Sequence, residues 1–505
     1  MNKATPEKRI FNGRLGKNLI SGGISHIVSA ALSLVLTPFL IGRLGIEMYG
    51  FYPIALEAMA VIGLLMGVLN STAGRYVAVE YAGGRREEAG RYFSTVFFDG
   101  LFAALLLAAP AMLFVVFSDG ILDMPYGKET EIKIFLALML LSCLIDAVTS
   151  VFGAGYVISG RLDLRAVQDL SAVFVKAILF WFLLSGVWVV SMIGVGVAVL
   201  VSSVVSACIR IWLAHVLVPD VRLKWRDHSV AYLWRVLGSG LWYSVESLGT
   251  RLTGGGLLLL VSIAYGAERA GVYSLSLTAA RVFGSVLLML AGVFVPTVTR
   301  KFADGDREAL LSDVLCGIRM VGFFALVGVS MAVGFLKEFL ELWLGAENTP
   351  LLRLLCVFSL VPMLSVATAL PLFQLSVIMN RLRRMALLYV AGALLGLAAA
   401  LGIAMLTEVG IFGVAAVSFA VRVVWYSVCM PFFGARLLSC EPIRLLFPVL
   451  RTHVGAAISV GAIIALKSVC RIDSIPSLML VMAVCLCSVL VIGYFSVYGR
   501  RNLKM

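Results

Sequence analysis

Apolar stretches of about 20 residues, separated by short polar or charged breaks, recur along the whole chain. A helix of that length crosses the roughly 30 Å hydrocarbon core of a lipid bilayer. The pattern therefore predicts an all-α, polytopic membrane protein with about 14 transmembrane helices. The expected spans are residues 18–41, 52–72, 92–117, 133–158, 166–186, 189–215, 234–264, 270–298, 311–336, 350–378, 385–407, 410–434, 449–468 and 475–498.

Composition excludes a water-soluble protein. Of the 505 residues, 61% are hydrophobic and only 14% are charged, whereas soluble domains are nearer half apolar and a quarter charged. The connections between the expected spans are mostly short, and none is long enough to hold an extramembrane domain.

The net charge of +13 first suggests a nucleic-acid partner. Twenty-nine Lys and Arg residues, however, fall in one alternating set of loops and helix ends, and eight fall in the other set. This asymmetry is the positive-inside pattern of membrane proteins. We therefore expect a multi-pass protein with both termini in the cytoplasm and no nucleic-acid partner.

A short phrase occurs twice. GIEMYGFY at 45–52 and GAERAGVY at 266–273 share the pattern Gly-x-Glu-x-x-Gly-x-Tyr, and residues 45–89 align with 266–310 without a gap. Six expected spans separate the two copies, so both copies have the same orientation in the membrane. This indicates a parallel repeat of two six-helix bundles around a central cavity.

The repeat predicts three parts of the chain. Residues 1–225 form an N-lobe, residues 226–434 form a C-lobe, and residues 435–505 hold an interfacial segment followed by two further helices. The interfacial segment is GARLLSCEPIRLLFPVLR at 434–451, in which apolar residues alternate with arginines.

The stretches RLGIEMYGFY and GRYVAVEYAGGRREEAGRYF, after the first and second expected helices, resemble the polysaccharide and O-antigen flippases. These belong to the multidrug/oligosaccharidyl-lipid/polysaccharide transporter superfamily. The resemblance covers essentially the whole chain, including the last helix pair. It implies two lobes that rock about a cavity and export a polyprenyl-(di)phosphate-linked oligosaccharide across a prokaryotic cytoplasmic membrane for cell-surface polysaccharide synthesis.

The resemblance also has implications for partners. It implies a lipid-linked glycan substrate, contact with membrane lipids, and a place beside polysaccharide polymerase or ligase machinery. In related flippases the last two helices form a groove for the lipid tail.

Charged residues within membrane spans are costly, and function is their usual explanation. Cations suited to a phosphate or diphosphate are Arg251, Arg281, Lys176 and Arg422, with Arg75 at the inner end of the second span. Arg251 is the leading candidate, because the sequence SLGTRLTGGGL places it beside three glycines that loosen the helix. The alternative is that the cations pair with acids such as Asp146 or Asp169.

The acids within spans are Glu246, Asp146, Asp99 and Glu57. A carboxylate that binds H⁺ or Na⁺ is the usual means of coupling transport to an ion gradient. The sequence leaves open whether these acids couple an ion or only pair with cations. It predicts no cofactor, catalytic residue or metal site.

Two other functions remain open. A multidrug exporter of the same superfamily typically has twelve helices and acids that face its cavity, whereas deep cations favour an anionic substrate. A membrane glycosyltransferase or glycan polymerase would need a catalytic site beside a larger outer loop than this chain offers. The sequence therefore predicts a transporter and not an enzyme.

Overall fold

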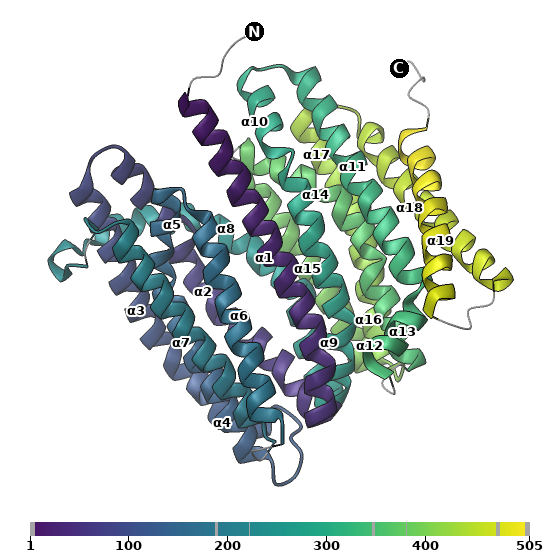
Figure 1. Ribbon diagram of the computed structural model, residues 1–505, viewed down its shortest axis with the longest axis horizontal. Coiled ribbons are helices and arrows are strands. Elements are labelled where there is room, and N and C mark those ends of the chain that lie inside the picture. Colours follow the sequence, from purple (N-terminus) through teal and green to yellow (C-terminus); the bar gives the residue numbers. More distant parts are fainter. Residues whose placement is uncertain are drawn as a thin grey trace. The chain divides into compact units, whose positions relative to one another are not determined.

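The computed structural model describes residues 6–186, 190–221, 223–345, 349–379, 381–470 and 475–499, nearly all of them in helices (Figure 1). The side chains of residues 6–20, 70–73, 75, 239, 240, 243, 475 and 476 are outside this description. The chain forms two compact units. The first contains residues 1–251 and 258–271, and the second contains residues 252–257 and 272–505.

The elements of the first unit are α1 (Pro6–Leu44), α2 (Ile46–Ala82), α3 (Arg86–Val116), η1 (Ser118–Gly120), α4 (Glu129–Thr149), η2 (Ser150–Gly153), α5 (Ala154–Ser159), α6 (Leu162–Leu184), α7 (Met192–Leu217), η3 (Trp225–Asp227) and α8 (Val230–Arg251). α4 packs along α7, α2 along α3 and α8, and α1 along α6.

A π-helical turn, η4 (Leu252–Gly256), follows α8 directly. α9 (Leu257–Gly292) then begins in the first unit and continues in the second from Val272. The remaining elements are α10 (Val295–Ala303), α11 (Arg307–Gly334), α12 (Leu336–Leu344), α13 (Pro350–Leu360), α14 (Pro362–Ile378), α15 (Leu382–Leu406), α16 (Ile411–Val424), the π-helical turn η6 (Trp425–Cys429), α17 (Met430–Leu438), α18 (Pro442–Val469) and α19 (Ile475–Tyr498).

The predicted fold class is confirmed. Within the described residues, thirteen helical stretches are long and apolar enough to cross a membrane. One of them, Ser244–Ala303, has 60 residues, about 90 Å of helix and three times the thickness of the hydrocarbon core. Gly266 interrupts it with non-helical angles (φ 80°, ψ 173°). This stretch therefore supplies two passes, in agreement with the expected 14 helices, and the chain is a multi-pass membrane protein.

The backbone repeats along with the sequence. Gly45, which precedes α2, has φ 79° and ψ 160°, close to the angles of its repeat partner Gly266. At the far end of the aligned region, Gly84 and its partner Gly305 have φ values of 76° and 73°. Left-handed conformations are costly for residues with a Cβ atom, so glycine is required at both ends of both copies.

Substitution of Gly84 or Gly305 by alanine should therefore lower stability by about 1 kcal/mol each through backbone strain. No atom lies within 4 Å of the Cβ that either alanine would add, so strain is the only expected cost. Thermal unfolding of the purified variants would measure it. Gly292→Ala, in a helical position with equally open space, is the control, and equal melting temperatures for all three variants would contradict the prediction.

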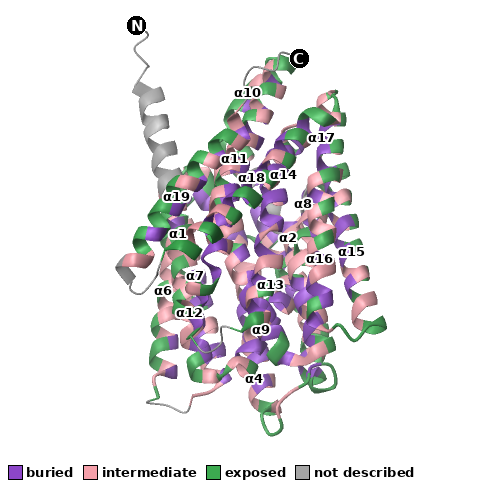
Figure 2. Cartoon of the chain, turned by 90° about the vertical axis from the view of Figure 1, so that its right-hand side faces the viewer, coloured by how far each residue is buried: buried purple, intermediate pink, exposed green. Residues whose placement is uncertain are grey.

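The outward faces of the helices are apolar. On α3, Phe102, Leu105 and Leu106 are 65–69% exposed, while Tyr92, Phe93 and Val96 on the same helix lie in a buried cluster. Figure 2 shows exposed residues along the length of helices and not only at their ends. Such exposure is expected where lipid, and not water, covers the surface.

The last helix pair packs on the second unit. α18 and α19 lie side by side (Figure 1) and both contact α11, with Ala456, Ile463, Cys485 and Val489 in the shared core. The predicted interfacial segment 434–451 is not an element of its own. α17 runs to Leu438, and α18 starts at Pro442 as a continuous helix of 28 residues.

The compact units change over at residue 251, later than the expected lobe boundary at residue 225. The reason is that α8 packs along α2 and α3 of the first unit. The division into an N-lobe, a C-lobe and a C-terminal part that follows from the repeat remains a prediction.

Candidate functional site

The first unit contains a cavity of about 990 Å³. One wall is a face of α2 made of small residues spaced mostly by three, four or seven positions, which places them on one side of the helix. These residues are Ala60, Gly63, Gly67, Gly74, Ala78 and Ala82. Because their side chains are short, they leave the space that the cavity occupies.

Other helices contribute polar and charged residues to the cavity lining. These include Asp146, Arg165, Gln168, Asp169, Arg210 and Arg251. These residues come from α4, α6, α7 and α8. Three guanidinium groups and two carboxylates therefore face one space, beside an apolar wall.

Arg210 is the centre of a hydrogen-bond network. It donates from Nη1 to Thr149 Oγ1 at 2.9 Å and to the carbonyl oxygen of Asp146 at 3.3 Å. Its Nη2 donates to Ser206 Oγ at 3.3 Å and lies 3.5 Å from Asp146 Oδ1. The Arg210 side chain is 14% exposed, whereas that of Asp146 is 44% exposed. The acid is thus open to the cavity while the arginine behind it is held in place.

The network extends in two directions. Ser203 donates to Asp146 Oδ2 at 2.8 Å. On the other side, Gln168 Nε2 donates to Ser206 Oγ at 2.7 Å and accepts from the buried Tyr156 hydroxyl at 2.8 Å. Buried polar groups that are fully hydrogen-bonded keep a unique arrangement, so these side chains form a preorganised surface.

A second, smaller cavity of about 290 Å³ also has Asp146 in its lining. It is lined by Lys176 of α6, by Tyr52 of the first repeated phrase, and by Ser142 and Ser203. Asp146 lines both cavities. Arg165 lies near the start of α6 and Arg210 near the end of α7, and both line the larger cavity. Lys176 lies farther along α6 and lines the smaller cavity.

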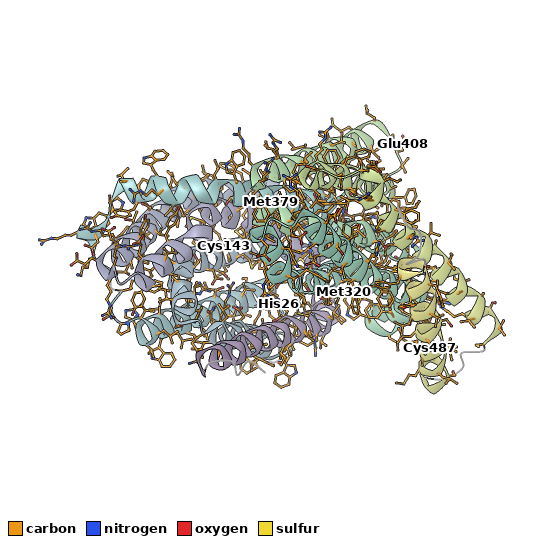
Figure 3. The ribbon with its side chains drawn as sticks, turned by 90° about the horizontal axis from the view of Figure 1, so that it is seen from above. His26, Cys143, Met320, Met379, Glu408 and Cys487 are labelled. Carbon is orange, nitrogen blue, oxygen red and sulfur yellow. The ribbon has the colours of Figure 1, made fainter. Side chains whose placement is uncertain are left out.

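Asp169 lies near two basic groups. Arg165 Nε is 3.9 Å from Asp169 Oδ2, one helical turn away. His26 of α1, labelled in Figure 3, also interacts electrostatically with Asp169. In the described part of the chain, Asp146 forms an ion pair with Arg210, and Asp169 forms an ion pair with Arg165. Neither acid is paired with Lys176, as the alternative interpretation of Lys176 would require.

Arg251 and Lys176 both line cavities, as a substrate-contact role requires. Arg251 is exposed and, in the part of the chain that the structure describes, has no ion-pair partner. Arg75 lies in α2, but its side chain falls outside the described residues. Arg210 lies within the expected span 189–215 but was counted only among the basic residues of the inner loops and helix ends; the structure places it in α7 and in the cavity lining. The signal was present: Ser203, Ser206 and Arg210 are spaced by three and four residues, on one helix face.

The other predicted acids do not line these two cavities. Asp99 Oδ1 bonds with His228 Nε2 at 2.9 Å and thereby holds the segment before α8 against α3. Glu57 lies within α2 and is only 8% exposed. Glu246 accepts from the Thr250 hydroxyl at 3.3 Å on its own helix.

The second unit brings Arg281 and Arg422 together around Tyr273, the tyrosine of the second repeated phrase. Tyr273 hydrogen-bonds with Ser418 and interacts electrostatically with both arginines. Nε of Arg422 and Nε1 of Trp425 are buried without a hydrogen-bond partner among the described residues. They lie three residues apart, at the point where α16 enters the π-helical turn η6.

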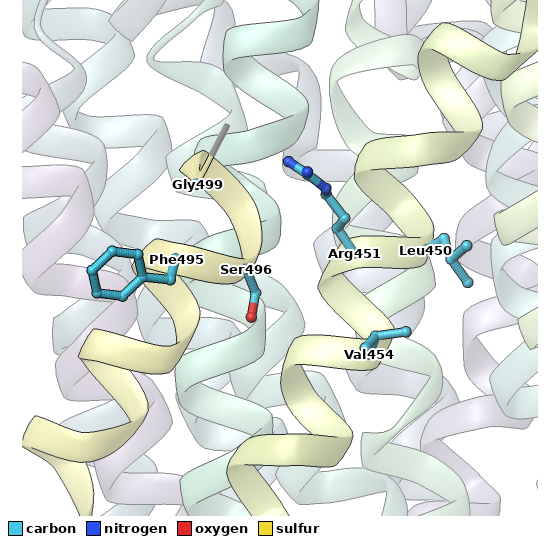
Figure 4. A pocket seen from close by; sticks show the side chains of 6 residues that line it. All are labelled: Leu450, Arg451, Val454, Phe495, Ser496 and Gly499. Atoms are coloured by element: carbon cyan, nitrogen blue, oxygen red, sulfur yellow. The ribbon is translucent and has the colours of Figure 1, made fainter. Parts of the chain in front are cut away.

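α18 and α19 border an open groove of about 600 Å³ (Figure 4). Leu450, Arg451 and Val454 line it from α18, and Phe495, Ser496 and Gly499 line it from α19. The Arg451 guanidinium lies over the Phe447 ring, 4.3 Å from its centroid, a favourable cation–π arrangement. The groove is on the helix pair for which the resemblance implies contact with a lipid tail, and that role remains a prediction.

No protein family model matches the chain. The structure is similar to that of the lipid II flippase MurJ in an inward closed conformation, with a TM-score of 0.69 and 13% identity, over 94% of this chain and 98% of that one. An inward-facing multidrug resistance MATE family transporter of the MOP superfamily gives a TM-score of 0.65 and 17% identity, over 81% and 94% of the two chains. The chain has the fold of the MOP superfamily transporters.

The same fold is found in a MOP superfamily transporter from Pyrococcus furiosus, described as having a binding pocket of reversed polarity, with a TM-score of 0.57 and 18% identity over 84% of this chain and 95% of that one. Among curated proteins, the Bacillus subtilis (strain 168) protein named uncharacterized membrane protein EpsK is 22% identical over 458 residues, 90% of each chain. The MOP fold structures matched here are of transporters and flippases, not of enzymes.

Proposed function

We propose that this protein is a flippase for a polyprenyl-(di)phosphate-linked oligosaccharide. It moves the glycan headgroup from the cytoplasmic to the outer leaflet of a prokaryotic cytoplasmic membrane by alternating access. The transported unit then serves cell-surface polysaccharide synthesis.

The cavity of the first unit carries this proposal. A volume of about 990 Å³ is at the upper end of the range for small-molecule sites, so it accommodates a sugar headgroup. Arg251, which has no ion pair in the described structure, is available for a phosphate, and guanidinium groups bind phosphate through paired hydrogen bonds. Asp169, which is exposed, offers acceptor oxygens for sugar hydroxyls.

The alternative is an ion-coupled multidrug exporter. Its support is the pair of carboxylates in the cavity, Asp146 and Asp169, which suit a cationic drug or a coupling H⁺ or Na⁺. Both carboxylates already face arginines, at 3.5 Å and 3.9 Å. The cavity lining has three arginines and two carboxylates, a balance that favours an anionic substrate.

The proposal is tested by transport in proteoliposomes that contain a short-chain polyprenyl-diphosphate oligosaccharide. We expect translocation by the wild type and a loss of at least about tenfold in Arg251→Ala, because a hydrogen bond to a charged group contributes about 1.5–3 kcal/mol. Arg235→Ala is the matched control: Arg235 lies on the same helix, is exposed, and does not line the cavity. We expect it to transport normally.

Two results would contradict the proposal. Translocation that survives Arg251→Ala unchanged would remove Arg251 from the site. Absence of translocation by the wild type, together with export of a cationic dye, would favour the multidrug exporter.

A further inference from the structure

Lys176, which lines the smaller cavity of the first unit, lies deep within an apolar helix. The membrane-spanning stretch that contains it ends at Leu184, eight residues after Lys176. Eight residues of helix are about 12 Å long, a distance that a lysine side chain does not cover to reach the membrane surface. A charge at this depth is costly and calls for a counter-charge or a function.

Lys176 has no counter-charge among the described residues. In that part of the chain its ammonium group has neither an ion pair nor a hydrogen bond. Asp146, the acid in the lining of the same cavity, is already paired with Arg210 and accepts a hydrogen bond from Ser203. Ser142 donates to Ser203 at 2.7 Å, because the single hydroxyl hydrogen of Ser203 is used for Asp146. The nearby hydroxyl donors are therefore directed toward the acid.

A second donor in this lining is also unused. Tyr52 lines the cavity from α2, and in the described structure its hydroxyl has no hydrogen-bond partner. The Tyr52 ring packs edge-on against Phe180, with 6.2 Å between the ring centroids. Phe180 lies one helical turn after Lys176, on the same face of α6. The Tyr52 ring is thus held against the face of α6 that carries the lysine.

The second unit shows the same combination by itself. Tyr273, the tyrosine of the second repeated phrase, interacts electrostatically with Arg422. Nε of Arg422 is buried without a hydrogen-bond partner among the described residues. In each unit, therefore, the tyrosine of the repeated phrase accompanies a cation that has no acid paired with it in the described structure.

The size of the smaller cavity restricts the class of ligand. Its volume of about 290 Å³ is at the lower limit of small-molecule sites, so an oligosaccharide headgroup does not fit, whereas a chloride or inorganic phosphate ion does. An ammonium group only donates hydrogen bonds, and a phenol hydroxyl donates one. Water would accept these hydrogen bonds but leave the charge uncompensated. An anion does both.

We propose that the smaller cavity binds a small inorganic anion, chloride or phosphate, through the Lys176 ammonium and the Tyr52 hydroxyl. The anion is the counter-charge of Lys176 and stabilises the first unit. This site is separate from Arg251 in the larger cavity, and the inference does not depend on which substrate the protein transports.

Thermal unfolding of the purified full-length protein tests the site. The buffer contains lactobionate, an organic anion too bulky for the cavity, and either chloride or phosphate replaces it at constant ionic strength. A ligand that binds only the folded protein raises the melting temperature by mass action. We expect a rise of about 2–5 °C for the wild type at a hundredfold excess over the dissociation constant.

Variants assign the response to the cavity. Lys176→Met should lose it, and in lactobionate alone this variant should melt at a higher temperature than the wild type, because an uncompensated charge is gone. Lys176→Arg should keep the response. Tyr52→Phe removes a hydrogen bond to a charged group and should weaken the anion affinity about tenfold or more. Lys337→Met is the matched control: Lys337 is exposed on α12, lines neither cavity, and its loss should leave the response unchanged.

Three results would overturn the proposal. A wild-type melting temperature that responds to neither anion would leave Asp146 as the counter-charge of Lys176. An equal response in the wild type and in Lys176→Met would show a general salt effect. A response to a short-chain polyprenyl diphosphate alone would place the substrate phosphate, and not an inorganic anion, at Lys176. The chloride and phosphate measurements contain no lipid-linked substrate, so a failure here is distinguishable from a failure of the proposed function, which the translocation assay reports.

Discussion

Arg210→Met is expected to abolish transport and to lower stability by about 1–3 kcal/mol. The substitution removes the donors for Thr149 and Ser206 and leaves the Asp146 carboxylate without its cation. The loss is smaller than for a fully buried pair because Asp146 is 44% exposed to the cavity. Thermal unfolding of the purified protein measures stability, and the proteoliposome assay measures transport.

A double variant separates the two effects of this change. Asp146→Asn combined with Arg210→Met removes the unpaired charge, so stability should recover by a measurable part of the loss while transport stays absent. A single Arg210→Met protein that keeps wild-type melting temperature and transport would show that the network is dispensable.

Arg422→Met is expected to act in the opposite way on stability. Arg422 lies within α16, its Nε is buried without a partner, and the described structure gives it no ion pair. Replacing such a cation with an apolar side chain of similar length should stabilise the protein by about 1 kcal/mol. Transport should nevertheless fall. A charged residue that destabilises a membrane span is usually present because it has a function, and the substitution removes that function.

The matched control is Arg436→Met on α17, where the arginine is exposed. It should change neither the melting temperature nor transport. A lower melting temperature for Arg422→Met would show that Arg422 is a structural residue held by Tyr273 and its neighbours, and would remove it from the candidate phosphate-binding cations.

The helices and the repeat could be predicted because both are local properties of the sequence. An apolar run of sufficient length specifies a span. Glycines at equivalent positions of the repeat, such as Gly45 and Gly266, allow the same positive φ angle in both copies. Arg251 could be selected for the same reason, since a charge beside three glycines within a span is visible in one short stretch.

The partners of the charges could not be predicted. Asp146 and Arg210 are 64 residues apart, and Asp99 and His228 are 129 apart, so only the packing of α4 on α7 and of the linker on α3 brings each pair together. Arg210 was missed because it was counted among the basic residues of the inner loops and helix ends, although the expected span 189–215 included it. The sequence does not reveal that the packing of α7 on α4 turns this residue toward a cavity.

The π-helical turn after Arg251 has a consequence for the equivalence of the two copies. A π turn holds one more residue than an α turn, and α1, the counterpart of this region in the first copy, is described as an uninterrupted helix from Pro6 to Leu44. The residues before the turn are therefore displaced by about one position of helical register relative to α1. Arg251 lies on this side of the turn, so the two copies differ there in backbone geometry as well as in residue type.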